Sequence, residues 1–180
     1  MRNSPPMGAL AMNWGKKKIG GQIYDLTHLD PFILPVTPKI ATAPTFLVRV
    51  SFGCHVFTKK WEEPFTPDLR VVYGSEERCF CIDRHSLSLN LPQIIKETAL
   101  SRVYFSQRDS FVVPRNMPGL NGPYAVFFKI DKARSDDFDA RMIVVSAYEK
   151  PGIPKRLPAI TFATLVSNVV LERPVRRPKK

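Results

Sequence analysis

The chain has 180 residues, of which 44% are hydrophobic, so it can bury one core, whereas each of two separate cores would be small. Its 27 basic and 16 acidic residues give a formal net charge of +11, and such a protein associates with polyanions. No stretch approaches the roughly 20 apolar residues that cross a bilayer, so we expect no membrane-spanning helix and no membrane partner.

The two ends of the chain are polar and basic. Charged segments with few apolar residues tend to remain disordered, so we predict disorder at residues 1–20 and a basic tail at 173–180, with one domain at 21–172 between them. The first 18 residues lack the hydrophobic region of a signal peptide. The three cysteines are an odd number and predict no disulfide framework. Together these features predict a cytoplasmic protein.

Apolar residues alternate with polar ones in the first half of the chain. Residues 45–52 have the period of a half-buried strand. Gly53 interrupts the pattern, and residues 54–58 are expected to resume the strand after a bulge or hairpin. Two further strands are predicted at 69–73 and 78–82, because Gly74-Ser75 between them is a turn signal.

One principal helix is predicted after these strands. Asn90 can cap it, Pro92 suits its first turn, and apolar residues recur at helical spacing through Leu100. The order of strands, one helix and more strands predicts an α+β fold with a mainly antiparallel, curved sheet. The later strands are expected as a hairpin of 103–106 with 111–113, two central strands at 124–130 and 141–148, and a long final strand at 160–171.

Cysteine and histidine side chains lie close together in two neighbouring elements. Cys79 and Cys81 would face the same side of a strand, and His85 follows them, but the C-x2-4-C spacing of a zinc turn is missing. In a strand, Cys54 and His55 would point to opposite faces of the sheet, so only one of them could be a ligand of the same zinc site. We therefore predict no metal and no cofactor. A zinc-stabilised adaptor built on Cys79, Cys81 and His85 is the alternative.

His55 is the candidate acid/base group. It follows a glycine on a predicted strand, and Arg78 and Arg84 belong to the strands that follow. Metal-independent RNA cleavage needs a base for the 2′-OH proton and cations around the phosphate, which His55 and the two arginines could supply. The alternative is a surface histidine near ordinary arginines. We assign His55 as the base and Arg78 and Arg84 as phosphate-binding groups.

A third group of polar residues lies at the end of the predicted strand 141–148. Ser146 and Tyr148 share one face of that strand, and a proline-rich loop follows. No G-x-S-x-G motif surrounds Ser146, so a hydrolase triad is not supported. We assign Ser146 and Tyr148 as auxiliary donors in the catalytic site. The residues expected to bind nucleic acid are Lys59, Arg173, Arg176 and Arg177.

Five stretches of the chain resemble a family of bacterial and prophage-encoded proteins labelled phage-associated or stationary-phase adaptation proteins. The resemblance implies a bacterial, mobile-element context and no particular activity. The stretches are Tyr24 to Phe32, Ser51 to Thr58, Pro123 to Phe128, Ser146 to Lys150 and Ile160 to Ser167.

The chain is also similar to the compact metal-independent ribonucleases of the barnase, colicin and RelE-like group. These enzymes have a helical part followed by a curved antiparallel sheet, and one strand ends near a polar tripeptide such as Ser146-Ala147-Tyr148. This chain differs in having one clear helix and in placing His55 and Arg84 before it. The similarity implies cleavage of RNA without a metal.

These observations predict a nucleic-acid-directed protein of bacterial or phage origin. Its sharper form is a ribonuclease-like toxin or effector that acts on RNA. The alternative is a non-catalytic interaction module of a mobile element, whose basic face binds nucleic acid or an acidic partner protein. The sequence leaves the substrate, the oligomeric state and any cognate inhibitor open.

Overall fold

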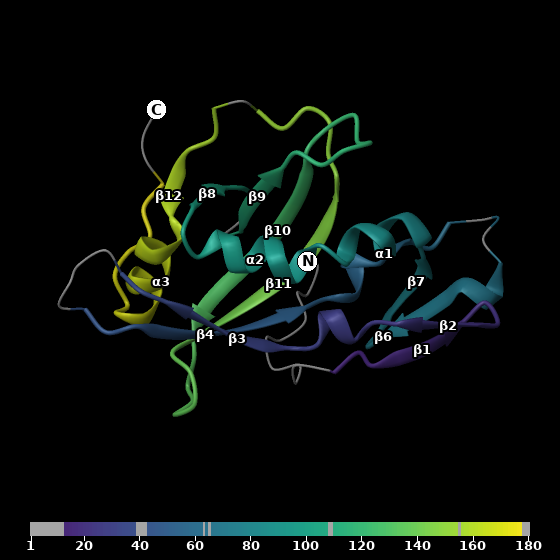
Figure 1. Ribbon diagram of the computed structural model, residues 1–180, viewed down its shortest axis with the longest axis horizontal. Helices are drawn as coiled ribbons and strands as arrows, with labels where there is room; N and C mark the ends of the chain where they lie inside the picture. The colour runs from purple at the N-terminus through teal and green to yellow at the C-terminus, as the bar shows by residue number, and fades with distance from the viewer. Residues whose placement is uncertain are drawn as a thin grey trace.

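The computed structural model describes residues 13–38, 43–62, 64, 66–107, 110–154 and 156–177 (Figure 1). Within these ranges, no helix has both the length and the apolar character needed to span a bilayer.

A seven-stranded sheet forms the centre of the molecule. All of its neighbouring strands pair antiparallel except β11 and β4, which are parallel. This pairing brings together residues far apart in the chain, with Ala140 opposite Val48. In spatial order the strands are β12 (Ala159–Thr161), β8 (Arg102–Phe105), β9 (Phe111–Arg115), β10 (Tyr124–Lys132), β11 (Ala140–Glu149), β4 (Phe46–Phe52) and β3 (Phe32–Val36).

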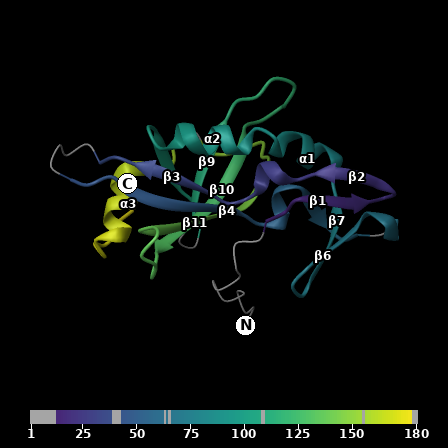
Figure 2. The same cartoon turned by 60° about the horizontal axis from the view of Figure 1, so that its bottom comes forward.

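Two smaller sheets and three helices complete the described fold. One end of the molecule carries a three-stranded sheet, a two-stranded sheet and α1, whereas α3 lies at the opposite end (Figures 1 and 2). The smaller sheets are β5 (Thr58–Lys60), β7 (Glu76–Phe80) and β6 (Arg70–Tyr73), and β1 (Lys16–Ile19) with β2 (Gln22–Asp25). The α-helices are α1 (Ile82–Ser88), α2 (Leu91–Thr98) and α3 (Phe162–Val170), and the 3-10 turns are η1 (Thr27–Leu29), η2 (Cys54–Val56) and η3 (Pro67–Leu69).

The core lies between one face of the large sheet and the helices. Phe128 of β10 is fully buried, and its ring packs edge-on against Phe162 of α3. Side chains of a strand point alternately to its two faces, so Phe127 and Lys129, on either side of Phe128, lie on the other face, where they are only half-buried. One face of an antiparallel sheet commonly remains accessible to solvent in this way. This more accessible face of β10 and β11 carries part of the candidate site.

The structure confirms the α+β fold with mainly antiparallel sheets, but the expectation of one principal helix is wrong. Residues 82–88 form α1 instead of continuing a strand, and residues 162–170 form α3. Thr161 caps α3, because its hydroxyl accepts a hydrogen bond from the Thr164 amide at 3.2 Å. The sequence of α3 resembles that of a strand because it is rich in β-branched residues, which favour strands.

The N-terminal prediction needs a partial correction. Trp14 is 4% exposed, and its indole nitrogen donates a hydrogen bond to the Phe52 carbonyl at 3.1 Å. Residues 16–19 form β1, so the part of the predicted disordered segment that the structure describes is ordered. Residues 1–12 and 178–180 lie outside the described residues. In the predicted basic tail, Val175 packs against the core.

The expected continuation of the strand beyond Gly53 is also wrong. Residues 54–56 form the turn η2, and strand pairing resumes only at Thr58. The Gly53 amide donates a hydrogen bond to the Val144 carbonyl of β11 at 2.9 Å. The chain leaves the direction of β4 at this point, and η2 begins beside β11. This turn determines where the His55 side chain lies.

Candidate functional site

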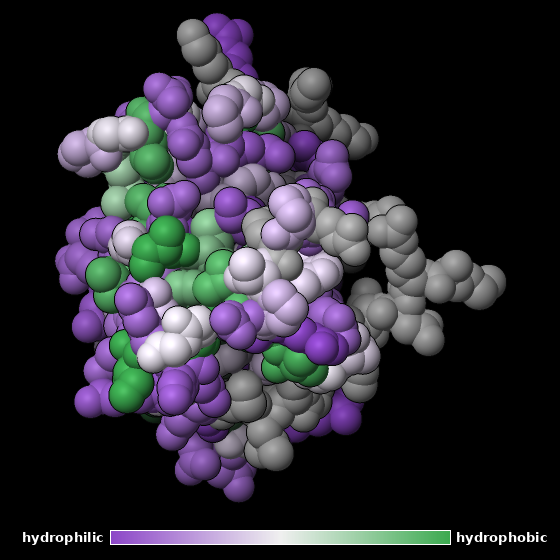
Figure 3. All heavy atoms as spheres, turned by 90° about the vertical axis from the view of Figure 1, so that its right-hand side faces the viewer, coloured by the Kyte–Doolittle hydropathy of each residue, from purple (hydrophilic) through white to green (hydrophobic). Residues whose placement is uncertain are grey.

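Four of the predicted site residues come together at the end of the molecule that carries α1. His55 belongs to η2, Arg78 to β7, Arg84 to α1 and Tyr148 to β11. Figure 3 views this end of the molecule. Hydrophilic residues cover much of the face drawn in colour, with hydrophobic residues in separate patches between them. A surface of this kind favours a polar or charged ligand over a large apolar partner.

Thr58 joins the elements of this cluster. It is fully buried, and its hydroxyl donates to the Cys54 carbonyl at 2.7 Å and accepts from Nε of Arg78 at 2.7 Å. Its carbonyl accepts from Arg84 at 2.7 Å. A buried group with several satisfied hydrogen bonds holds its partners in a fixed geometry. Thr58 therefore fixes the two arginines relative to η2.

Arg84 lies between the turn η2 and strand β11. One terminal nitrogen of its guanidinium donates to the carbonyls of His55 at 3.1 Å and of Thr58 at 2.7 Å. The guanidinium carbon lies 5.1 Å from the centre of the Tyr148 ring, a cation–π contact. Burial lowers the pKa of Arg84 from its usual value, yet an arginine stays charged in proteins. A positive charge is therefore held at fixed geometry beside Tyr148.

Arg78 directs its guanidinium toward protein acceptors. Nε donates to the Thr58 hydroxyl, one terminal nitrogen lies 3.5 Å from the Thr58 carbonyl, and the other lies 3.8 Å from the Glu76 carboxylate. The side chain is 13% exposed. These contacts make Arg78 a positioning residue for Thr58 and Glu76, and they leave its predicted role as a phosphate-binding group without geometric support.

His55 forms a close pair with Glu76, which sequence reasoning missed. Nε2 of the imidazole lies 2.6 Å from the Glu76 carboxylate, and both side chains are partly exposed. A carboxylate on one ring nitrogen orients the imidazole and selects the tautomer that keeps the proton on that nitrogen. Nδ1 then carries the lone pair that could accept a proton. The pairing depends on the turn at η2, which the sequence did not reveal.

Tyr148 belongs to an aromatic group on the more accessible face of the sheet. Its ring stacks on Phe127 of β10 at 5.5 Å between centres, and the Lys150 ammonium lies 5.8 Å from each ring centre. Ser146 is half-buried two residues before Tyr148 and lies opposite Phe127 in the strand pairing. The pairing register shifts between Phe127 and Phe128. Ser146 thus lies beside the aromatic pair, and no hydrogen bond joins it to His55 or to either arginine within the described residues.

The predicted nucleic-acid-binding residues lie in two separate regions. Lys59 is exposed on β5, next to Thr58. Arg173, Arg176 and Arg177 are exposed after α3, at the opposite end of the molecule. They form no single surface with His55.

Cys54 lies close to two other side chains that can bind a metal. One group of described residues could hold a metal: the ligand atoms of Cys54, His55 and Glu76 all lie within 4.8 Å of one another. The prediction that only one of Cys54 and His55 could join such a group is wrong, because η2 is a turn and not a strand. Burial raises the pKa of Cys54 to about 11, and the nearby Arg78 guanidinium brings a positive charge that opposes a cation.

The alternative zinc ligands do not come together in the described part of the chain. Cys79 and Cys81 are free and buried, and Cys81 directly precedes α1. His85 instead packs its ring against Phe80, Tyr24 and His28. Burial raises the pKa of the Cys79 thiol, as expected of a packing cysteine.

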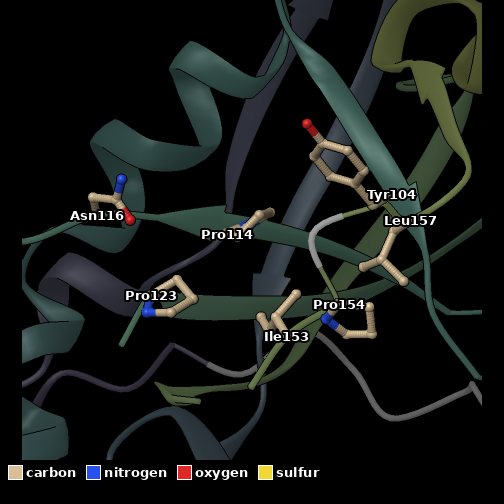
Figure 4. Close-up of a pocket in the computed structure, with 7 residues that line it drawn as sticks. All are labelled: Tyr104, Pro114, Asn116, Pro123, Ile153, Pro154 and Leu157. Atoms are coloured by element: carbon tan, nitrogen blue, oxygen red, sulfur yellow. The ribbon is translucent and has the colours of Figure 1, made fainter. Parts of the chain in front are cut away.

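A small pocket of about 390 Å³ lies between β8, β9 and the loop that follows β11 (Figure 4). Three prolines and two aliphatic side chains form most of its wall, and Tyr104 and Asn116 supply the polar groups. Unlike the His55 cluster, this pocket has no charged side chain and no histidine among its described lining residues. Its lining residues are Tyr104, Pro114, Asn116, Pro123, Ile153, Pro154 and Leu157.

Comparison with known proteins gives one result. The model of the YjaZ family matches residues 16–170, which is most of the chain, and the chain therefore belongs to the YjaZ family. Comparisons with curated proteins and with solved structures gave no match, so the similarity to compact ribonucleases gains no support from them.

Proposed function

We propose that this YjaZ-family protein binds RNA across the surface formed by Arg84, Lys150 and the stacked Phe127–Tyr148 pair. The observation that carries the proposal is that two cations flank two half-buried, stacked aromatic rings. Proteins that bind single-stranded nucleic acid combine cations along the backbone with aromatic rings that contact the bases. The formal net charge of +11 favours the same class of ligand.

The two cations have different roles in this proposal. Lys150 is only partly buried at the end of β11, so its ammonium can follow a mobile phosphate. Arg84 is held by two carbonyls through one terminal nitrogen, and its remaining nitrogens can donate to a phosphate. A strand of RNA would thus cross Tyr148 between the two charges.

Binding is tested with a fluorescent single-stranded RNA by anisotropy at low salt. Lys150→Gln is the main variant, because this lysine follows the last residue of β11 outside the core and can be replaced without changing the core. We expect it to weaken binding by roughly fivefold to tenfold, since one phosphate contact is lost together with the two cation–π contacts that hold the ammonium beside the rings. Lys17→Gln removes an equal charge from exposed β1 and should have much less effect. Equal weakening by both variants would show that only net charge matters and would refute the surface.

Cleavage of the bound RNA is a second candidate function, favoured by the His55–Glu76 hydrogen bond. In this reaction Nδ1 of His55 takes the proton of the 2′-OH, and the 2′ oxygen attacks the adjacent phosphorus. The bond from phosphorus to the 5′ oxygen breaks, and this oxygen takes a proton from Tyr148 or from water. The products are a 2′,3′-cyclic phosphate and a 5′-hydroxyl; His55 returns its proton to solvent, and Tyr148, where it was the donor, takes a proton back from solvent.

The cleavage reaction is tested in EDTA by identifying the ends of the RNA products. Wild type should produce 2′,3′-cyclic phosphate ends and should arrest bacterial growth when expressed. His55→Ala should slow cleavage by about 100-fold or more while leaving RNA binding in place, the usual scale for loss of a general base. Glu76→Gln should slow it less, because the amide can still contact the ring. Intact RNA across a broad substrate panel would refute cleavage and leave binding.

A further inference from the structure

A second, larger pocket lies at the end of the molecule that carries α3. Its volume is about 870 Å³, within the range of sites for small organic ligands. It is lined by the end of β10, the start of β11, the β8–β9 hairpin, α3 and the segment that follows α3.

The strand lengths create this pocket. β9 pairs with β10 only as far as Phe111 opposite Phe128, whereas β10 continues to Lys132. Beyond Phe128, the edge of β10 that faces away from β11 has no described strand partner. α3 packs on one side of this notch, and Val175 packs against the core on the C-terminal side of α3. Val175 thereby brings Arg177 to the pocket, two residues further along.

Positive charge dominates the pocket wall. Five basic side chains line it, and Asp131 is the one acidic side chain among the described lining residues. Lys132 also forms a salt bridge of 2.8 Å with Glu172, and this contact lowers the pKa of Glu172. The basic residues are Lys129, Lys132, Arg134, Arg141 and Arg177.

The inner wall of the pocket is apolar. The rings of Phe105 and Phe111 lie 5.3 Å apart between centres, and Leu165 and Val169 of α3 face the same space. A ligand that fills the pocket therefore needs several negative charges together with a compact apolar or planar part.

We propose that this pocket binds a nucleoside polyphosphate. The basic rim would hold the phosphates, and the wall of Phe105, Phe111 and Val169 would contact the base. The site lies away from the proposed RNA surface, since Arg141 and Tyr148 are at opposite ends of β11, about 23 Å apart along the strand. The inference goes beyond the proposed function and does not depend on it.

The test is isothermal titration calorimetry of the full chain with three probes: ATP, inorganic tripolyphosphate and adenosine. ATP should bind one per chain and more tightly than tripolyphosphate, because only ATP also contacts the apolar wall. Adenosine should bind far more weakly than either. Arg134→Gln and Arg177→Gln should each weaken ATP binding about tenfold, the scale for loss of one charged hydrogen bond. Both residues are exposed, so the fold should be retained.

Two control variants separate this inference from the proposed function. Lys60→Gln removes an exposed cation from β5, in a different sheet, and should leave ATP affinity unchanged. Lys150→Gln should weaken RNA binding and not ATP binding. The inference is overturned if ATP binds no better than adenosine, or if Lys60→Gln weakens ATP binding as much as Arg134→Gln does. Either result would leave the RNA surface untouched.

Discussion

The three histidines of this chain have different surroundings, and the proposed cleavage uses only His55. His28 is half-buried, and its Nε2 lies 2.8 Å from the hydroxyl of Ser88, which is fully buried. The His85 ring lies 5.8 Å from that of His28, and its Nε2 is buried without a partner among the described residues. The His28–His85 pair therefore contributes to packing near α1.

The surroundings of His28 predict a stability that depends on pH. Burial and the neighbouring His85 lower the pKa of His28 below its usual value of 6.5, although Asp25 and Asp30 act in the opposite direction. As the pH falls below 6.5, the unfolded chain takes up this proton before the folded chain does. The stabilisation is thus complete above pH 6.5 and declines as the pH falls toward the lower folded-state pKa.

Urea unfolding at pH 7.5 and 5.5 measures this effect. His28→Gln can keep a hydrogen bond to Ser88 but cannot titrate, so the variant should lose less stability than wild type between the two pH values. Lys17→Gln, on exposed β1, is the control and should retain the dependence of wild type. An identical loss in His28→Gln and wild type would assign the pH dependence to other groups.

At the scale of elements, the turns position the site more than the strands do. Glu149 accepts hydrogen bonds from the amides of Asn121 and Gly122 at 2.6 and 2.9 Å. The Lys150 amide donates to the Pro123 carbonyl at 3.0 Å. These contacts fix the loop before β10 against the end of β11, directly beside the Lys150 side chain.

Gly122 is required by this close approach. A Cβ at this position would lie 2.9 Å from two backbone atoms of Pro151, which cannot move without displacing Lys150. Gly122→Ala should therefore destabilise the fold by about 1–3 kcal/mol and weaken RNA binding. Gly53→Ala is the matched control and should change stability little, since its Cβ would lie no closer than 3.5 Å to the nearest atoms, the carbonyl oxygens of Val144 and Val145. Thermal unfolding that ranks the two variants in the opposite order would contradict this account.

Alternation of apolar and polar residues predicted β4, and apolar runs predicted β10 and β11 as central strands. The same reasoning failed for α3. Its buried residues Phe162, Leu165 and Val166 have helical spacing, but four of its nine residues are β-branched, a composition that favours a strand. Residue types alone suggested His55, Arg84 and Tyr148, whose proximity the structure shows. The sequence did not predict the role of Glu76 or Thr58, because their contacts depend on the turn η2.

At the scale of the whole molecule, the positive charge is divided between two ends. Arg84 and Lys150 lie at the end with α1, and the basic pocket and C-terminal arginines lie at the end with α3. A long RNA that contacts both ends would release more counterions than one that contacts a single end. The dependence of RNA affinity on salt concentration therefore reports whether the RNA contacts one end of the molecule or both.

Replacing Arg173, Arg176 and Arg177 together by Gln tests this division. If all three contact a long single-stranded RNA, the slope of log affinity against log salt should fall by about 2, at roughly 0.7 per contact. Replacing Lys16, Lys17 and Lys18 on β1 by Gln removes the same charge and should change the slope less. Equal changes in the two triple variants would show that the C-terminal segment has no specific contact.

The parallel pairing of β4 with β11 also has a consequence for synthesis of the chain. Val48 emerges from the ribosome 92 residues before its partner Ala140. At translation rates of roughly 5–20 residues per second, β4 waits about 5–18 s with one edge unpaired. During that time only β3 pairs with it, and an apolar strand edge exposed on a nascent chain is a site for aggregation or for chaperone binding.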